Sequence, residues 1–214
     1  MNQSPFARRV GMFGGAFDPP HAAHRALAQA ALQQLGLDVL HILPTGLAWH
    51  KSRTLSAAEH RVAMCERAFS DLPGVCVDER EIRRAGPSYT ADTLTELSAE
   101  YPGAELFLML GADQLLAFRT WSRWDEVLKL ARLAVANRPV HLGATDAHAA
   151  TVETDLSAVD LPFVQLNMPL QATSSTAIRA HVHGQSRRYP DLDVLVPEGV
   201  ARYISEHHLY ESPT

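Results

Sequence analysis

Residues 11–24 read GMFGGAFDPPHAAH, and this stretch decides the fold that we predict for the chain. Val10, Met12 and Phe13 are typical of the end of a short buried strand, while residues 25–35 repeat leucine and alanine at helical spacing. Between them lie a glycine pair and then Asp18 with two prolines, and proline is favoured where a helix begins. The stretch therefore predicts a strand, a glycine-rich turn and a helix start, which together direct backbone N–H groups at a phosphate.

His21 and His24 lie one helical turn apart at the start of that helix, so both rings can face the same side. Imidazoles placed there can donate hydrogen bonds to a phosphoryl group as charge develops on it. Taken singly, a glycine pair is more often an ordinary turn and two such histidines are more often solvated. Taken together, these residue types favour phosphate chemistry, because each one meets a separate requirement.

Composition indicates a soluble globular enzyme. Of 214 residues 46% are apolar and 20% charged, and the net charge of −5 argues against nonspecific nucleic-acid binding. Cys65 and Cys76 form no CxxC motif, so we expect a reducing compartment and two core thiols. With no signal region and no apolar run of ~18–20 residues, we expect a cytoplasmic protein without a membrane partner. We expect a single domain, 1–214, with a helical C-terminal part from about residue 173.

The rest of the chain alternates apolar runs with helical patterns. Expected strands are 38–44, 75–77, 105–110, 132–137 and 162–166. One expected helix begins at a capping box at 56–59, another ends at about residue 100, and a third begins near residue 124. Three more are expected at about 151–158, directly after 173–176, and over 197–210. Strands that alternate with helices favour a parallel sheet. The predicted fold class is α/β: a Rossmann-like, doubly wound parallel sheet with flanking helices and a C-terminal helical segment.

Two segments follow strands, where ligands bind in parallel sheets. Lys51, in the loop after 38–44, is either a phosphate ligand or part of a solvent loop. Asp113, just after 105–110, can meet a ribose hydroxyl or a hydrated metal ion, or it can cap the next helix. Both alternatives stay open at this point.

Two further helix starts are candidate anion sites. Residues 86–94 read GPSYTADTL, and Ser88 or Thr90 can cap the helix that follows. Residues 173–179 read TSSTAIR, where three kinds of group, hydroxyls, backbone N–H and the Arg179 guanidinium, can surround a phosphate. The alternative for the second segment is an elaborate N-cap.

These motifs resemble those of bacterial nicotinate-nucleotide adenylyltransferases, within the nucleotidylyltransferase superfamily. The resemblance covers nearly the whole chain, in the opening motif (14–24), a P…HK loop (44–51), GPSYT-x-DTL (86–94), G-x-D with a downstream Trp (111–121) and SST-x-IR (174–179). The first and last motifs are shared across related adenylyltransferases. The run at 86–94 narrows the resemblance to this family.

The resemblance implies an enzyme of NAD biosynthesis that joins nicotinate mononucleotide and ATP into nicotinate adenine dinucleotide and pyrophosphate. The catalytic residues it implies are His21, His24 and Arg179. The implied ATP-binding residues are Gly14, Gly15, Phe17, His21, His24, Lys51, Gly111, Asp113, Ser174, Ser175 and Arg179. The implied residues for the mononucleotide are Ser88, Tyr89, Thr90 and Trp121. Mg²⁺ is expected to arrive with ATP, since the sequence offers no all-protein carboxylate cage, and no metal-binding residue is expected.

The chain departs from the family pattern at three positions. Trp49 stands where proline is usual, Val140 where glycine is usual, and Thr173 where an aliphatic residue is usual. None of these changes removes a charged or hydroxyl group from the expected site.

Some rival functions stay open, and others do not fit the sequence. An adenylyltransferase for nicotinamide mononucleotide stays open, whereas one for phosphopantetheine does not explain the motif at 86–94. A dinucleotide oxidoreductase needs G-x-G-x-x-G, which residues 11–15 do not fit. The presence of both histidines and Arg179 argues against a non-catalytic nucleotide-binding regulator. A His-rich metal-binding protein is disfavoured because the sequence has no close grouping of histidines and carboxylates. The sequence does not determine the oligomeric state, and a homo-oligomer is possible.

Overall fold

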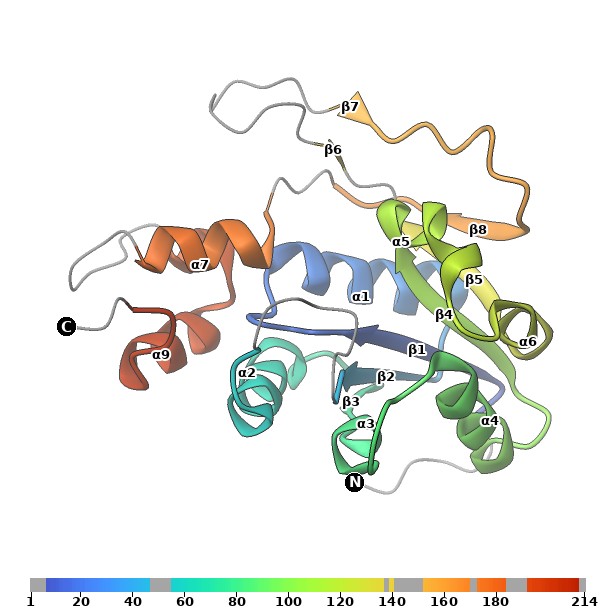
Figure 1. Cartoon of the computed structure of the whole chain (residues 1–214), viewed down its shortest axis with the longest axis horizontal. Coiled ribbons are helices and arrows are strands. Elements are labelled where there is room, and N and C mark those ends of the chain that lie inside the picture. Colours follow the sequence, from blue (N-terminus) through green and yellow to red (C-terminus); the bar gives the residue numbers. More distant parts are fainter. Residues whose placement is uncertain are drawn as a thin grey trace. The chain divides into compact units, whose positions relative to one another are not determined.

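A computed structural model of the chain describes residues 7–46, 55–136, 139–140, 152–169, 173–183 and 192–211. Within them a sheet of six strands has the order β3-β2-β1-β4-β5-β8 (Figure 1). Its strands are β1 (Arg9–Gly15), β2 (Val39–Pro44), β3 (Val75–Val77), β4 (Glu105–Gly111), β5 (Arg132–Ala136) and β8 (Phe163–Leu166). The pairings of β4 with β1 and β5, and of β5 with β8, are parallel, which confirms the predicted α/β fold class. A short antiparallel pair joins β6 (Pro139–Val140) to β7 (Val152–Glu153).

Helices alternate with these strands. They are α1 (Ala22–Leu35), α2 (Ala58–Phe69), α3 (Arg80–Arg83), α4 (Thr90–Glu100), α5 (Ala112–Leu116), η1 (Phe118–Thr120), α6 (Trp124–Leu130), α7 (Ser175–His183), α8 (Leu192–Leu195) and α9 (Glu198–Glu206). None of the helices in the described ranges is long and apolar enough to cross a membrane.

The chain forms two compact units. Unit 1 comprises 1–13, 26–41 and 89–172, and unit 2 comprises 14–25, 42–88 and 173–214. The prediction of a single domain over 1–214 stays a prediction.

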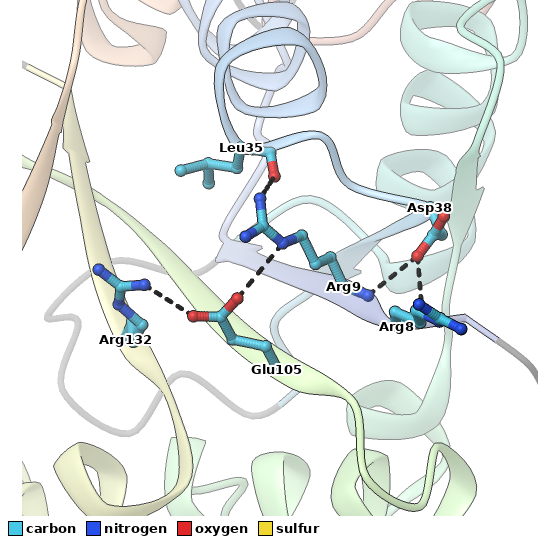
Figure 2. A network of polar contacts seen from close by, with 6 residues as sticks. All are labelled: Arg8, Arg9, Leu35, Asp38, Glu105 and Arg132. Carbon is cyan, nitrogen blue, oxygen red and sulfur yellow. Dashed lines mark hydrogen bonds and ion pairs between the residues drawn. The ribbon is translucent and has the colours of Figure 1, made fainter.

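The core of unit 1 is built on β4, whose sequence ELFLMLG is buried through its centre because it is apolar at every central position. Leu108 faces Leu133 of β5 in register, and both side chains are buried. One edge of this unit carries a polar network (Figure 2). There Glu105 lies between Arg9 and Arg132, at 3.3 and 2.7 Å, and so links β4 to β1 and β5.

The core of unit 2 joins α2 to α9. Met64 and Phe69 of α2 are fully buried, as are Val200 and Ile204 of α9, which lie four residues apart on one side of that helix. The start of α1 also belongs to this unit. Arg25 fastens it to the end of α2, since its guanidinium donates to the Ala68 carbonyl and to the Asp71 carboxylate at 2.6 Å.

Three cap predictions are wrong. The Ser56 side chain does not cap α2, whose N-cap position is Ala57. The Ser56 N–H instead donates to the Asp18 carboxylate at 3.3 Å, a tertiary contact that local spacing cannot reveal. At α4 the N-cap position is Tyr89 without a side-chain bond, so neither Thr90 nor Ser88 caps it.

Other predictions need correction as well. The helix expected at about 151–158 is absent from the described part, 152–158, because residues 152–153 pair with β6 as β7. The final helix, expected over 197–210, ends at Glu206. Cys65 is buried as expected, but Cys76 is only half-buried.

Candidate functional site

The two motif histidines lie together at the start of α1. His21 occupies the position before the first helical residue, and its backbone N–H donates to Nδ1 of His24 at 3.3 Å. This is half of a capping box, with an imidazole where Glu or Gln usually stands. Because Nδ1 of His24 accepts, a neutral His24 ring carries its proton on Nε2 and can donate from that atom.

The two imidazoles are stacked, with centroids 3.7 Å apart and planes at 25°. His21 is 1% exposed, whereas His24 is partly accessible. The predicted pairing of these rings on one side of the helix is therefore confirmed. His24 is the member of the pair that solvent or a ligand can reach.

Phe17 has a different place from the one expected of an ATP-binding residue. Its ring is 1% exposed and meets the ring edges of His24 and Phe69, with centroids 5.0 and 6.0 Å away. Phe17 thus supports His24 from the core. Gly15 allows this, since a Cβ there would lie 3.2 Å from the Phe17 ring, while Gly14 is exposed.

The closing motif contacts the same turn. Oγ of Ser175 donates to the carbonyl of Pro19 at 2.9 Å, and Nη1 of Arg179 donates to the carbonyl of Asp18 at 2.7 Å. Ser174 caps α7, since its Oγ accepts the N–H of Ala177 at 3.1 Å. The start of α1 and the start of α7 are thereby joined, and two helix N-termini favour an anion beside them. Four expected residues for the ATP phosphates come together here: His21, His24, Ser175 and Arg179.

Sequence reasoning missed three residues that hold this turn: Asp18, Arg61 and Tyr210. The Asp18 carboxylate is fully buried and accepts the Tyr210 hydroxyl at 2.7 Å. Arg61, 3% exposed, donates to the carbonyls of Ser56 and Ala16, each at 3.0 Å. An arginine at an inward position of α2 was the one available signal, and nothing local marks Tyr210.

The charge on Arg61 is buried. Burial lowers the pKa of its guanidinium, and the nearby Asp18 carboxylate partly opposes that change. Arginine keeps its proton even so, which means that a positive charge stands behind the turn throughout the physiological pH range. The arrangement offsets the cost of burying the Asp18 carboxylate.

The residues expected for the mononucleotide ring belong mainly to unit 1. Tyr89 and Thr90 lie at the start of α4 and are half-buried, as is Trp121. Ser88 belongs to unit 2 and is engaged, because its Oγ donates to the Glu81 carbonyl at 3.1 Å.

Arg123 is a further residue of unit 1 that the sequence did not single out. Its guanidinium contacts the Asp92 carboxylate at 2.5 Å and lies 5.5 Å from the centroid of the Tyr89 ring. It stands in the left-handed conformation, φ 55°, directly before α6. Arg123 therefore ties two residues of the 86–94 motif to the segment that carries Trp121.

Three further residues were expected to bind ATP: Gly111, Asp113 and Lys51. Gly111 ends β4 in unit 1, and Asp113 is exposed in the first turn of α5, where its carboxylate accepts the side-chain amide of Gln114 at 3.2 Å. Lys51 lies outside the described residues. Across those residues no group of three or more His, Cys, Asp or Glu could hold a metal ion.

Comparison with known proteins identifies relatives over the full length. Residues 12–181 match the cytidylyltransferase-like family. Probable nicotinate-nucleotide adenylyltransferases from Albidiferax ferrireducens and Methylibium petroleiphilum are 49% and 43% identical to this chain. They cover 96% and 100% of it, with 99% and 97% of their own lengths.

A solved structure supports the fold. Plasmodium falciparum nicotinic acid mononucleotide adenylyltransferase, complexed with NaAD, aligns with a TM-score of 0.72 over 95% of this chain and 97% of its own. At 17% identity this likeness bears on the fold alone. The sequence relatives and the matched family model show to which family the chain belongs. The chain belongs to the nicotinate-nucleotide adenylyltransferase family of cytidylyltransferase-like proteins.

Proposed function

We propose that this chain transfers the adenylyl group of ATP to nicotinate mononucleotide, giving nicotinate adenine dinucleotide and pyrophosphate. The observation that carries the proposal is that the turn before α1 and the start of α7 are held together in unit 2. There His24, Ser175 and Arg179 converge beside two helix N-termini, in a chain 49% identical to a probable nicotinate-nucleotide adenylyltransferase. Such a set of donors suits a polyphosphate.

The chemistry needs no covalent enzyme intermediate. An oxygen of the mononucleotide phosphate attacks the α-phosphorus of ATP, a new P–O bond forms, and the bond to the pyrophosphate oxygen breaks. The protein positions two anions and stabilises the charge that develops between them. In this proposal Nε2 of His24 and the Arg179 guanidinium donate to the phosphate oxygens, His21 orients His24, and Gly14 and Gly15 let the phosphates approach the backbone.

Mg²⁺ is proposed to arrive with ATP and to neutralise charge on the phosphates. The donor set fits this role, because it consists of imidazole, hydroxyl and guanidinium groups that bind phosphate oxygens and not the metal. The exposed carboxylate of Asp113 can accept from a ribose hydroxyl or from water on the metal. Gly111, Ser174 and Lys51 stay proposed ATP contacts.

The nicotinate carboxylate is proposed to bind at the start of α4. Backbone N–H groups of Tyr89 and Thr90 can donate to it there, and the Trp121 ring can stack on the pyridine ring. The Ser88 hydroxyl is already bonded to Glu81, so its proposed contribution is to shape this turn. The reaction involves neither nucleic acid nor a membrane, and we propose a cytoplasmic location.

The test is pyrophosphate release with ATP and Mg²⁺, comparing nicotinate mononucleotide with nicotinamide mononucleotide and phosphopantetheine. We expect release with the nicotinate compound and a preference for it over nicotinamide of at least about tenfold, since a carboxylate suits N–H donors better than an amide does. Equal use of the two mononucleotides would retain the chemistry and reject the proposed carboxylate contacts. No release with any acceptor would reject the enzyme and favour a nucleotide-binding regulator.

A further inference from the structure

The buried carboxylate of Asp18 lies at the centre of the phosphate-binding turn, which we define as residues 14–24. It is fully buried, and an ionised carboxylate in such a place needs hydrogen-bond donors. Its carboxylate accepts the Tyr210 hydroxyl at 2.7 Å on Oδ1 and the Ser56 N–H at 3.3 Å on Oδ2. The bond from Tyr210 is the shorter of the two.

Tyr210 reaches Asp18 from the segment that follows α9, 192 residues further along the chain. Its backbone stands at φ 69°, a left-handed conformation that is unfavourable for a residue other than glycine. The main chain of this segment is held by the N–H of Leu209, which donates to the carbonyl of Ile204 at 3.0 Å. The unfavourable conformation at Tyr210 is thus maintained by contacts around it, and it delivers the hydroxyl to Asp18.

The hydroxyl acts as a donor at every pH at which the enzyme works. Burial, and then the charge of Asp18, raise the pKa of Tyr210 well above its ordinary value. The phenol therefore keeps its proton. Since Asp18 can only accept when ionised, the direction of this hydrogen bond is settled.

The main chain of the same residues is held from the other side by α7. Arg179 donates to the Asp18 carbonyl at 2.7 Å and Ser175 to the Pro19 carbonyl at 2.9 Å. The side chain of Asp18 is thus held by Tyr210, and the backbone carbonyls of Asp18 and Pro19 are held by two residues proposed to bind ATP. These side-chain and backbone contacts together hold the turn that ends in His21 and His24.

We propose that Tyr210 is a positioning residue for adenylyl transfer: through the Asp18 carboxylate it holds the phosphate-binding turn so that His24 and Arg179 meet the ATP phosphates. Tyr210 itself touches no substrate in this scheme. The proposal rests on the function proposed above, and it adds a residue that lies far from the motifs in sequence.

The decisive variant is Tyr210→Phe, which removes the hydroxyl and keeps the ring. With one donor lost, the buried Asp18 carboxylate draws the turn out of place, and a displacement of about 1 Å costs up to about 10²-fold in rate. We expect kcat to fall by about 10- to 100-fold and the dissociation constant for ATP to rise severalfold. The KM for nicotinate mononucleotide should stay within about twofold, because its proposed contacts lie elsewhere.

Tyr203→Phe is the matched control. Tyr203 lies in α9, seven residues before Tyr210, and its hydroxyl is 3.0 Å from Nδ1 of His60, so this variant also loses one side-chain hydrogen bond. It leaves Asp18 untouched, and we expect unchanged kcat and ATP affinity. Thermal unfolding of both variants shows whether their stabilities fall alike.

A double variant tests the route through the carboxylate. In an Asp18→Asn background, Tyr210→Phe should change kcat and ATP affinity by less than about twofold, since the charge that the hydroxyl holds is gone. Full additivity of the two changes would overturn the proposal. So would unchanged kinetics in Tyr210→Phe, or losses in Tyr210→Phe and Tyr203→Phe that are equal.

ATP affinity, measured by titration calorimetry, separates this proposal from the proposed function. If the wild-type chain released no pyrophosphate, the proposed function would fail. Tyr210 would then be judged on ATP binding alone: weaker binding in Tyr210→Phe but not in Tyr203→Phe supports positioning, and equal binding rejects it.

Discussion

At the scale of single residues, His24 combines a structural and a chemical task. Its Nδ1 accepts the His21 N–H and so caps α1, and its ring rests on the buried ring of Phe17. Both contacts orient Nε2 as the donor. An imidazole suits this position because its two nitrogens can accept on one side and donate on the other.

We predict that His24→Ala retains the fold and lowers kcat for pyrophosphate release by about 10²- to 10³-fold, the usual cost of removing one donor to developing charge. The loss of the cap lowers stability by only about 1 kcal/mol. Circular dichroism checks the fold, and His183→Ala, at the exposed end of α7, is the control. A folded His24→Ala variant with wild-type turnover would remove His24 from the mechanism.

At the scale of elements, the end of β2 approaches α3 more closely than any side chain permits. A Cβ on Gly46 would lie 2.2 Å from the Glu81 carbonyl oxygen and 3.0 Å from its carbon. Backbone cannot yield as a flexible side chain can. The charged segment at 80–83, which forms the unpredicted helix α3, is thus packed against the chain that leaves β2.

We predict that Gly46→Ala lowers the free energy of unfolding by about 1–3 kcal/mol, as overpacking does. Urea unfolding measures it. The control is Gly199→Ala in α9, where the new Cβ would lie 3.3 Å from Cβ of Arg67, a contact that a shift of a few tenths of an ångström relieves, and where alanine favours the helix. That variant should stay within about 1 kcal/mol of wild type. Equal stability of Gly46→Ala and wild type would contradict the close approach.

At the scale of the whole molecule, stability depends on pH through carboxylates such as Asp38. Its carboxylate accepts the N–H groups of Arg9 and Arg8, at 2.9 and 2.7 Å (Figure 2). These bonds, Arg9 first, hold its pKa below the ordinary 3.8. Because the unfolded chain binds the proton more readily, this contribution is present above about pH 4 and is lost as the pH falls through the lowered pKa.

We predict that Asp38→Asn is slightly less stable than wild type at pH 7, by less than about 1 kcal/mol because the site is exposed. Its stability should also fall less between about pH 5 and pH 3. Urea unfolding across this range tests both statements, with Asp193→Asn on the surface of α8 as control. Parallel curves for Asp38→Asn and wild type would rule out this source of pH dependence.

Much of the site could be found from sequence because it is local. The phosphate-binding turn and the closing motif are short runs in which glycine, proline, histidine and hydroxyl residues each meet a backbone or charge requirement. The strands could be predicted as readily, because a short apolar run such as ELFLMLG suits a strand that is buried at the centre of a sheet.

Tertiary structure alone decided which groups hold the turn. Ser56 was expected to cap α2 and instead binds Asp18, and Tyr210 meets the same carboxylate from 192 residues away. No local pattern encodes such contacts, because a buried carboxylate takes whatever donors the folded chain brings to it. By itself, then, the sequence predicted the strands, most of the helices and the residues that we propose to bind phosphate. The support of Asp18 and the placing of Arg123 over Tyr89 arose only when distant segments packed together.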